Sequence, residues 1–129
     1  GMVTGPLRNP DGFNFPERGS RRLKADPSRL TQVSDWVFDE NIWKRRSVLT
    51  LTMPWAKINN PKIDELEQRS RIISWLGTLS VDQEWLIQKA IANWLSSLSK
   101  HDIPAVLSFL EEYGAKMKPF AVNEACKFI

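Results

Sequence analysis

Only one segment of the chain has the pattern of a β-strand, and this fact limits the fold most. Residues 48–53, Val-Leu-Thr-Leu-Thr-Met, are rich in β-branched side chains and alternate in polarity, which favours a strand. No second segment is a convincing partner, and a lone strand leaves its backbone hydrogen-bonding groups unpaired. A helix over about 43–53, closed by Pro54, resolves the conflict. The sequence therefore predicts an all-α fold.

Helix start and stop signals divide residues 28–129 into amphipathic segments. Ser28 and Ser80 are candidate N-caps, Pro61 suits the first turn of a helix, and Gly77 and Gly114 are stop signals. The predicted helices cover about 28–39, 43–53, 61–76, 81–99, 102–113 and 119–129. About six helices with short connections predict antiparallel pairs, stacked as in a helical-repeat solenoid.

The N-terminal residues 1–29 differ from the rest in composition. They are rich in proline and glycine and show no helical period, so we expect a basic, irregular arm ahead of a helical domain over 30–129. Residues 1–30 carry six Lys or Arg against three acids, whereas the remainder carries twelve of each. The net charge of +3 therefore lies in the arm. Arg21 and Arg22 are candidate phosphate contacts there, and an ordinary solvated tail is the alternative.

Several classes of function receive no support from the composition. Cys126 is the single cysteine and His101 the single histidine, so the chain offers no metal-ligating cluster. Neither a metal nor an organic cofactor is implied. No segment approaches the roughly 20 apolar residues of a membrane span, and no signal-peptide core is present. We expect a cytoplasmic protein with no membrane association.

Two blocks place cationic side chains beside tryptophan, residues 41–46 (Asn-Ile-Trp-Lys-Arg-Arg) and residues 85–91 (Trp-Leu-Ile-Gln-Lys-Ala-Ile). Phe109-Leu110, Pro119 and Glu124-Ala125-Cys126-Lys127 follow at short intervals. With these motifs in this order, Trp36 to Ile129 resembles the C-terminal half of the AlkD-like DNA alkylation repair proteins. Those are DNA glycosylases, and the resemblance implies a HEAT-like α-α superhelix whose basic concave surface binds duplex DNA.

The resemblance also implies a reaction. AlkD-like proteins excise cationic purines, such as N3-alkyladenine and N7-alkylguanine, without base flipping. A cationic base is a good leaving group, and a nearby carboxylate and aromatic faces stabilise the positive charge that develops on the sugar. The alternative is a non-catalytic helical-repeat module that binds DNA or a protein partner. A carboxylate beside tryptophan on the basic surface, and Arg46 and Lys89 on one face, would favour the enzyme.

The resemblance also implies roles for individual residues. Arg45 and Arg46 match a pair of arginines of which one contacts the DNA backbone, while the other faces solvent or pairs with Asp39 or Glu40. Arginine suits this role because its planar fork binds phosphate oxygens bidentately. Lys89 matches a lysine near the concave face, where it contacts phosphate or forms a structural ion pair. Trp43 matches a packing position and, with Trp94, is a candidate aromatic of the lesion site.

The chain departs from the family pattern at the catalytic motif. No Trp-Asp-Leu-Val-Asp sequence is present, and the candidate carboxylate is Asp11, which lies in turn-forming Asn9-Pro10-Asp11-Gly12. The family's Gly-Trp is Ala92-Asn93 here, so Trp94 falls one residue later, about 100° around the helix. Catalysis therefore stays open. A solenoid without its first half would expose an apolar end, so self-association is also expected as an alternative.

Overall fold

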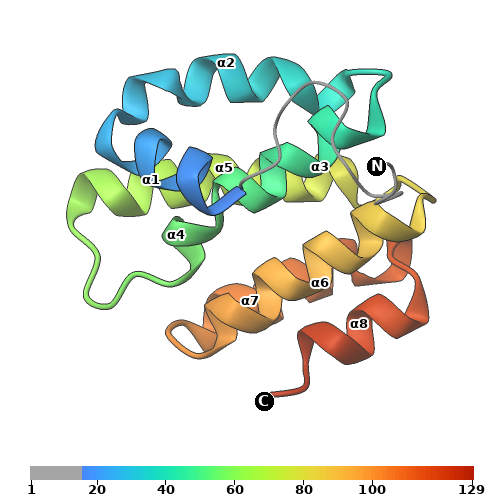
Figure 1. Ribbon diagram of the computed structural model, residues 1–129. Helices are drawn as coiled ribbons and strands as arrows, with labels where there is room; N and C mark the ends of the chain where they lie inside the picture. Colours follow the sequence, from blue (N-terminus) through green and yellow to red (C-terminus); the bar gives the residue numbers. More distant parts are fainter. Residues whose placement is uncertain (1–15) are drawn as a thin grey trace.

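The computed structural model describes residues 16–129, and every regular element in this part of the chain is a helix (Figure 1). The elements are α1 (Pro16–Ala25), η1 (Pro27–Arg29), α2 (Leu30–Asp35), η2 (Trp36–Phe38), α3 (Ile42–Leu51), α4 (Met53–Ala56), α5 (Ile63–Leu79), α6 (Trp85–Ser99), α7 (Ile103–Tyr113), η3 (Gly114–Lys116) and α8 (Pro119–Ala125). The all-α prediction is confirmed, and the succession of packed helices is consistent with a helical repeat.

Most of the segment with strand-like sequence lies in α3, and its last residue, Met53, begins α4. Asn41 caps α3, since its side-chain oxygen accepts a 2.8 Å hydrogen bond from the Trp43 backbone N–H. The Thr52 hydroxyl donates to the Val48 carbonyl at the C-terminal end, at 2.5 Å. Pro54 does not close the helix as predicted. It lies in the first turn of α4, where its missing N–H removes no helical hydrogen bond.

The described part of the predicted irregular arm is helical. Residues 16–25 form α1, which packs against α3 and α4. The prediction failed because it relied on proline and glycine as helix breakers. Pro16 stands at the first position of the helix, where proline is tolerated, and Gly19 lies where α1 passes close to α3: a Cβ there would be 2.5 Å from a methyl carbon of Leu51.

Other helix boundaries also differ from those predicted. Ser28 lies inside η1 and caps no helix, and α5 begins at Ile63 instead of Pro61. Ser80 does not begin α6: it ends α5, and its hydroxyl donates to the Gly77 carbonyl at 2.6 Å. Glu84 is the residue before α6 instead. At the other end, α8 stops at Ala125, short of the predicted chain end. Each difference arises at a helix end, where local signals compete over one turn.

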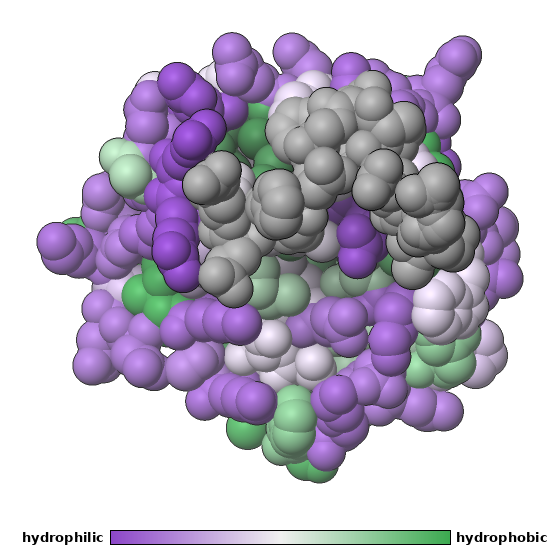
Figure 2. All heavy atoms as spheres, in the orientation of Figure 1, coloured by the Kyte–Doolittle hydropathy of each residue, from purple (hydrophilic) through white to green (hydrophobic). Residues whose placement is uncertain are grey.

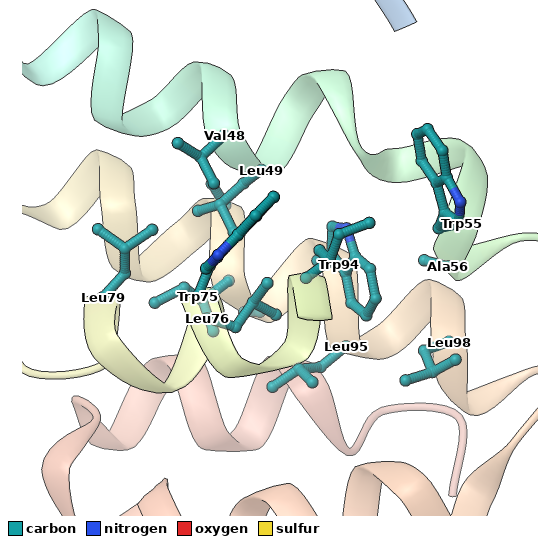
Figure 3. Packing of buried hydrophobic residues seen from close by; sticks show 14 of the residues in the cluster. Val48, Leu49, Trp55, Ala56, Trp75, Leu76, Leu79, Trp94, Leu95 and Leu98 are labelled. Atoms are coloured by element: carbon teal, nitrogen blue, oxygen red, sulfur yellow. The ribbon is translucent and has the colours of Figure 1, made fainter. Parts of the chain in front are cut away.

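Helix α6 is the centre of the core. Its apolar face is fully buried: Ile87, Ile91, Trp94, Leu95 and Leu98 each have 0% exposure. The helix packs most extensively against α8 and also contacts α3, α4, α5 and α7 (Figure 1). Figure 3 shows its side chains meeting those of α3 and α4 on one side and α5 on another. Because α3 and α6 pack against each other in this core, the exposed side chains along the line where the two helices meet have fixed positions relative to one another.

The surface is predominantly polar on the face that Figure 2 shows, and its apolar side chains form small, separate patches. Among the described residues, the exposed large apolar side chains are spread over many elements. The most exposed are Phe38 at 81%, Ile63 at 77%, Val81 at 58% and Trp85 at 56%. Isolated exposed apolar residues are normal in soluble proteins, but an exposed tryptophan beside cationic groups is a feature of ligand sites.

Gly77 was predicted to stop a helix but lies inside α5, where it makes room for a neighbour. A Cβ at this position would be 2.5 Å from Cζ of Tyr113 on α7. We expect Gly77→Ala to lower the free energy of unfolding by about 1–2 kcal/mol, because overpacking outweighs the gain in helix propensity. In a Tyr113→Ala background the same substitution should stabilise by up to about 1 kcal/mol. Urea denaturation of the four proteins tests this, and equal effects in both backgrounds would contradict the contact.

Candidate nucleic-acid interface

A half-open groove of about 240 Å³ lies between α3 and α6. Arg46 and Thr50 of α3, with Met53 at the start of α4, form one wall. Trp85, Lys89 and Asn93 of α6 form the other. Leu49, Leu86 and Ala90 complete the lining. Residues three or four apart share one face of a helix, so each helix turns a continuous stripe toward the groove.

Arg46 and Lys89, both predicted as phosphate contacts, line this same groove. Arg46 is half-buried, and the Lys89 side chain is 38% exposed. No acidic residue is among the groove-lining residues, so the two cations give the groove a positive character. The structure therefore brings together two cationic groups that are 43 positions apart in the sequence, in a place that solvent can reach.

Lys89 has one acidic neighbour at the edge of the groove. Its Nζ lies 3.9 Å from Oε2 of Glu124 on α8, a long contact. Glu124 makes a shorter bond with Lys127, at 2.5 Å. The hydrogen bond and charge of Lys127, and then the charge of Lys89, hold the pKa of the Glu124 carboxyl below its ordinary value. Glu124 thus stays ionised near neutral pH and competes for Lys89 with any anion in the groove.

Arg45 has a different role from Arg46. Its Nε donates to Asp82 at 2.8 Å, and its Nη1 donates to the carbonyls of Asp39 and Glu40, each at 2.9 Å. The side chain of Arg45 is only 17% exposed. The guanidinium therefore ties the start of α3 to the turn before α6. One of the two arginines was expected to face solvent or pair with Asp39 or Glu40, but the carboxylate that pairs with Arg45 is that of Asp82, and Asp39 and Glu40 contribute backbone carbonyls only.

A buried glutamine holds the other end of the same turn. Gln88 has 0% exposure, and its Nε2 donates to the carbonyls of Ser80 and Asp82 at 2.9 and 2.7 Å. Its Oε1 accepts from the Lys118 backbone N–H at 2.9 Å. A buried amide whose donors and acceptor are all engaged rigidifies its surroundings. Gln88 therefore fixes the α5–α6 turn and the start of α8 around the groove.

The three tryptophans considered for the site occupy different environments. Trp94 is fully buried, and its indole N–H donates to the Thr52 hydroxyl at 3.2 Å, so it offers no face to a base (Figure 3). Trp43 is half-buried and is not among the groove-lining residues. The aromatic side chain in the groove is Trp85, which stacks on Phe120 with ring centroids 5.9 Å apart. Its spacing of four from Lys89 was the signal that could have identified it.

The remaining predicted site residues lie away from the groove or outside the described part of the chain. Arg21 and Arg22 are exposed on α1 and are not among the groove-lining residues. Asp11 lies outside residues 16–129, so the prediction of its role stays a prediction. Within those residues no cluster of three or more histidine, cysteine or acidic side chains is arranged to bind a metal. None of the helices described there has the length and apolarity needed to cross a membrane.

Comparison with protein families agrees with this reading of the fold. The family described as DNA alkylation repair enzyme matches residues 15–129, which is most of the chain. The chain therefore belongs to the DNA alkylation repair enzyme family. A search of curated proteins finds no match. The matched region includes α3, α6 and every residue that lines the groove between them.

Proposed function

We propose that this protein binds duplex DNA through the groove between α3 and α6, as a DNA alkylation repair protein related to the glycosylases of its family. The observation that carries the proposal is that Arg46, Lys89 and Trp85 line one accessible groove. Guanidinium and ammonium groups bind phosphate oxygens, and neutralising phosphates releases counterions from DNA. A site with two cations and no acid in its lining suits the DNA backbone.

Trp85 extends the proposal from the DNA backbone to the base. The indole is 56% exposed, and Phe120 supports it from behind by stacking. The face of an indole attracts a positive charge, so Trp85 suits a cationic alkylated purine better than a neutral one. We propose that Arg46 and Lys89 hold the backbone while Trp85 contacts the base. Arg45 keeps the two helices in register through Asp82.

The reaction proposed is release of a cationic alkylated purine by cleavage of its glycosidic bond. Such a base leaves readily, and the protein must stabilise positive charge on the sugar. The experiment measures release of 7-methylguanine from methylated duplex DNA, together with binding of the same duplex. Release that falls in Arg46→Ala supports the glycosylase. Binding without release supports the alternative, a non-catalytic DNA-binding module. If the protein neither releases 7-methylguanine nor binds the duplex, the DNA assignment is contradicted.

A substitution at Glu124 tests the proposal by a predicted increase in affinity for duplex DNA. Glu124→Gln should raise duplex affinity, because it removes a negative charge beside Lys89 and the phosphates. The expected gain is about 1.5- to 5-fold at low salt, from the roughly 0.2–1 kcal/mol of an exposed ion pair, and it should vanish in high salt. Fluorescence anisotropy with a labelled duplex measures the change. Glu67→Gln, an equal charge change at an exposed position of α5 outside the groove lining, is the control. Equal gains in both would contradict a local role for Glu124.

A further inference from the structure

We infer that Lys100 and Lys127, beside the C-terminal end of α6, form a second phosphate-binding centre for the same duplex that the groove binds. The inference rests on the proposed DNA-binding function and extends the contact surface beyond the groove by about 16 Å along α6. Its basis is a pair of ammonium groups that approach the exposed ring of Phe128, on the side of α6 that carries Lys89.

Two cationic side chains meet at one aromatic ring at this end of the molecule. Nζ of Lys100 lies 4.4 Å from the ring centroid of Phe128, and Nζ of Lys127 lies 5.3 Å from the same centroid. All three side chains are exposed, so a ligand in solution can reach them. The ring attracts both cations and restricts their rotamers, so less side-chain entropy is lost when they bind an anion.

Positive charge exceeds negative charge around this ring. Within residues 16–129 Lys100 takes part in no ion pair, and Lys127 pairs only with Glu124. Glu124 is in turn shared with Lys89. Ammonium groups that approach one ring repel each other and raise the local positive potential, and a phosphate bound between them removes this repulsion. The cluster therefore suits an anionic ligand.

Lys89 and Lys100 lie on the same side of α6. Lys100 follows Lys89 by 11 positions, which corresponds to about three helical turns with a residual rotation of only about 20°. Lys89 contacts Glu124 on α8, which runs beside α6 (Figure 1). Lys100 contacts Phe128, which follows α8 in the chain. The groove and the second centre are therefore accessible along the same side of the α6–α8 pair.

The spacing of the two centres identifies duplex DNA as their common ligand. At a rise of about 1.5 Å per residue, Lys89 and Lys100 are about 16 Å apart along the axis of α6. Each strand of a duplex carries one phosphate for about every 3.4 Å of its axis, so about five base pairs cover this distance. A single nucleotide is too short to reach both centres, whereas a duplex that lies along α6 contacts both.

Lys100→Gln tests the second centre, because it removes the charge and leaves no acidic partner within residues 16–129 without its cation. We expect the affinity for a duplex of roughly 20 base pairs, measured by fluorescence anisotropy, to fall at least about threefold. The slope of log affinity against log salt should become shallower by about 0.9, the value for one lost phosphate contact.

The matched control is Lys116→Gln. Lys116 is an exposed lysine that also lies over an aromatic ring, that of Tyr113 at 5.4 Å, and it precedes α8, whereas Phe128 follows it. The control makes the same charge change and loses the same kind of ring contact, so it should alter the affinity by less than about 1.5-fold. Equal losses in the two variants would reduce the effect of Lys100 to general electrostatic attraction and overturn the inference.

Lys127 requires a different parent protein, because its removal also frees Glu124 to pair with Lys89. Lys127→Gln is therefore made in the Glu124→Gln protein, which has no carboxylate at that position. In this parent we expect a further loss of at least about threefold and a similar change of the salt slope. Equal affinities with and without Lys127 in this parent would show that it serves only to pair with Glu124, and its place in the centre would be overturned.

The outcomes also separate the inference from the proposed function. Free-energy losses of Lys100→Gln and Arg46→Ala that add in the double variant support separate contacts with one duplex. A loss in Arg46→Ala with none in Lys100→Gln overturns the second centre and leaves the groove as the DNA site. If the unaltered protein binds no duplex, the DNA-binding function itself fails. Circular dichroism verifies that each variant is folded, since Lys100 is also the C-cap residue of α6.

Discussion

Trp94→Ala should lower the free energy of unfolding by about 3–5 kcal/mol, the usual cost of truncating a buried tryptophan. The side chain has 0% exposure and packs between α6 and the α3–α4 segment (Figure 3). Its loss would also remove the hydrogen bond that the indole N–H donates to the buried Thr52 hydroxyl. Because small domains are stable by only about 5–15 kcal/mol, this single change should remove a large part of the total.

Trp85→Ala is the matched control. It removes the same side chain from the same helix at a position that is 56% exposed, so it should cost only about 1 kcal/mol, mostly from the stack with Phe120. Chemical denaturation followed by circular dichroism measures both variants. The reverse order, with Trp85 the more costly residue, would contradict the assignment of Trp94 to the core. A Trp94→Ala protein of normal stability that fails to bind DNA would return Trp94 to the lesion site.

The double variant Arg46→Ala/Lys89→Ala should weaken duplex binding by at least about a hundredfold. A hydrogen bond to a charged group contributes about 1.5–3 kcal/mol, and removing two such contacts costs at least about 3 kcal/mol. The slope of log affinity against log salt should also become shallower by nearly two, because two fewer counterions are released. Anisotropy titrations over a range of salt concentrations give both quantities.

The control for this prediction is Arg71→Ala/Lys116→Ala. It removes one arginine and one lysine from exposed positions outside the groove lining, so the net charge changes by the same amount. Long-range electrostatics alone would weaken binding equally in the two double variants. A large loss confined to the groove variant supports direct contacts, whereas equal losses would contradict them. Circular dichroism of both variants verifies that the fold is retained.

The sequence predicted the fold well where periodicity extends over several turns. The existence of α6 and α7 was predicted correctly because ten or more residues contribute to each pattern. The strand-like segment in α3 was assigned correctly only through a global argument, the lack of a pairing partner. Helix α1 was missed, since its stability comes from packing against α3 and α4, which local sequence signals do not report.

The site was predictable in part. Arg46 and Lys89 were candidates from the resemblance, but the groove that both line depends on how α3 packs against α6. The partner of Arg45 could not be inferred, because Asp82 is 37 positions away in the sequence. The same holds for Arg69, which is 4% exposed and donates to the Trp55 carbonyl at 2.9 Å. Contacts of this kind arise from three-dimensional packing, so a pattern in the sequence does not contain them.

The tryptophans show how a shift of one residue misleads. Trp94 lies one position after the place that the resemblance assigns to an aromatic residue. One residue corresponds to a rotation of about 100° around the helix, and the Trp94 side chain therefore points into the core. Asn93 occupies the outward position and lines the groove. The aromatic face is supplied instead by Trp85, two helical turns earlier on the same stripe. The groove thus has asparagine where the family has tryptophan, and its aromatic side chain comes from another position of the same helix.

The most direct test of the central claim locates DNA on the protein through the indole N–H signals of tryptophan in a ¹⁵N–¹H NMR spectrum. Trp85 lies in the groove, whereas Trp55 and Trp94 are fully buried and hydrogen-bonded to Gln68 and Thr52. Adding duplex DNA should move or broaden the Trp85 signal and leave those of Trp55 and Trp94 nearly unchanged, and Arg46→Ala should suppress the effect. Duplex binding that leaves Trp85 unperturbed would contradict the groove as the DNA site.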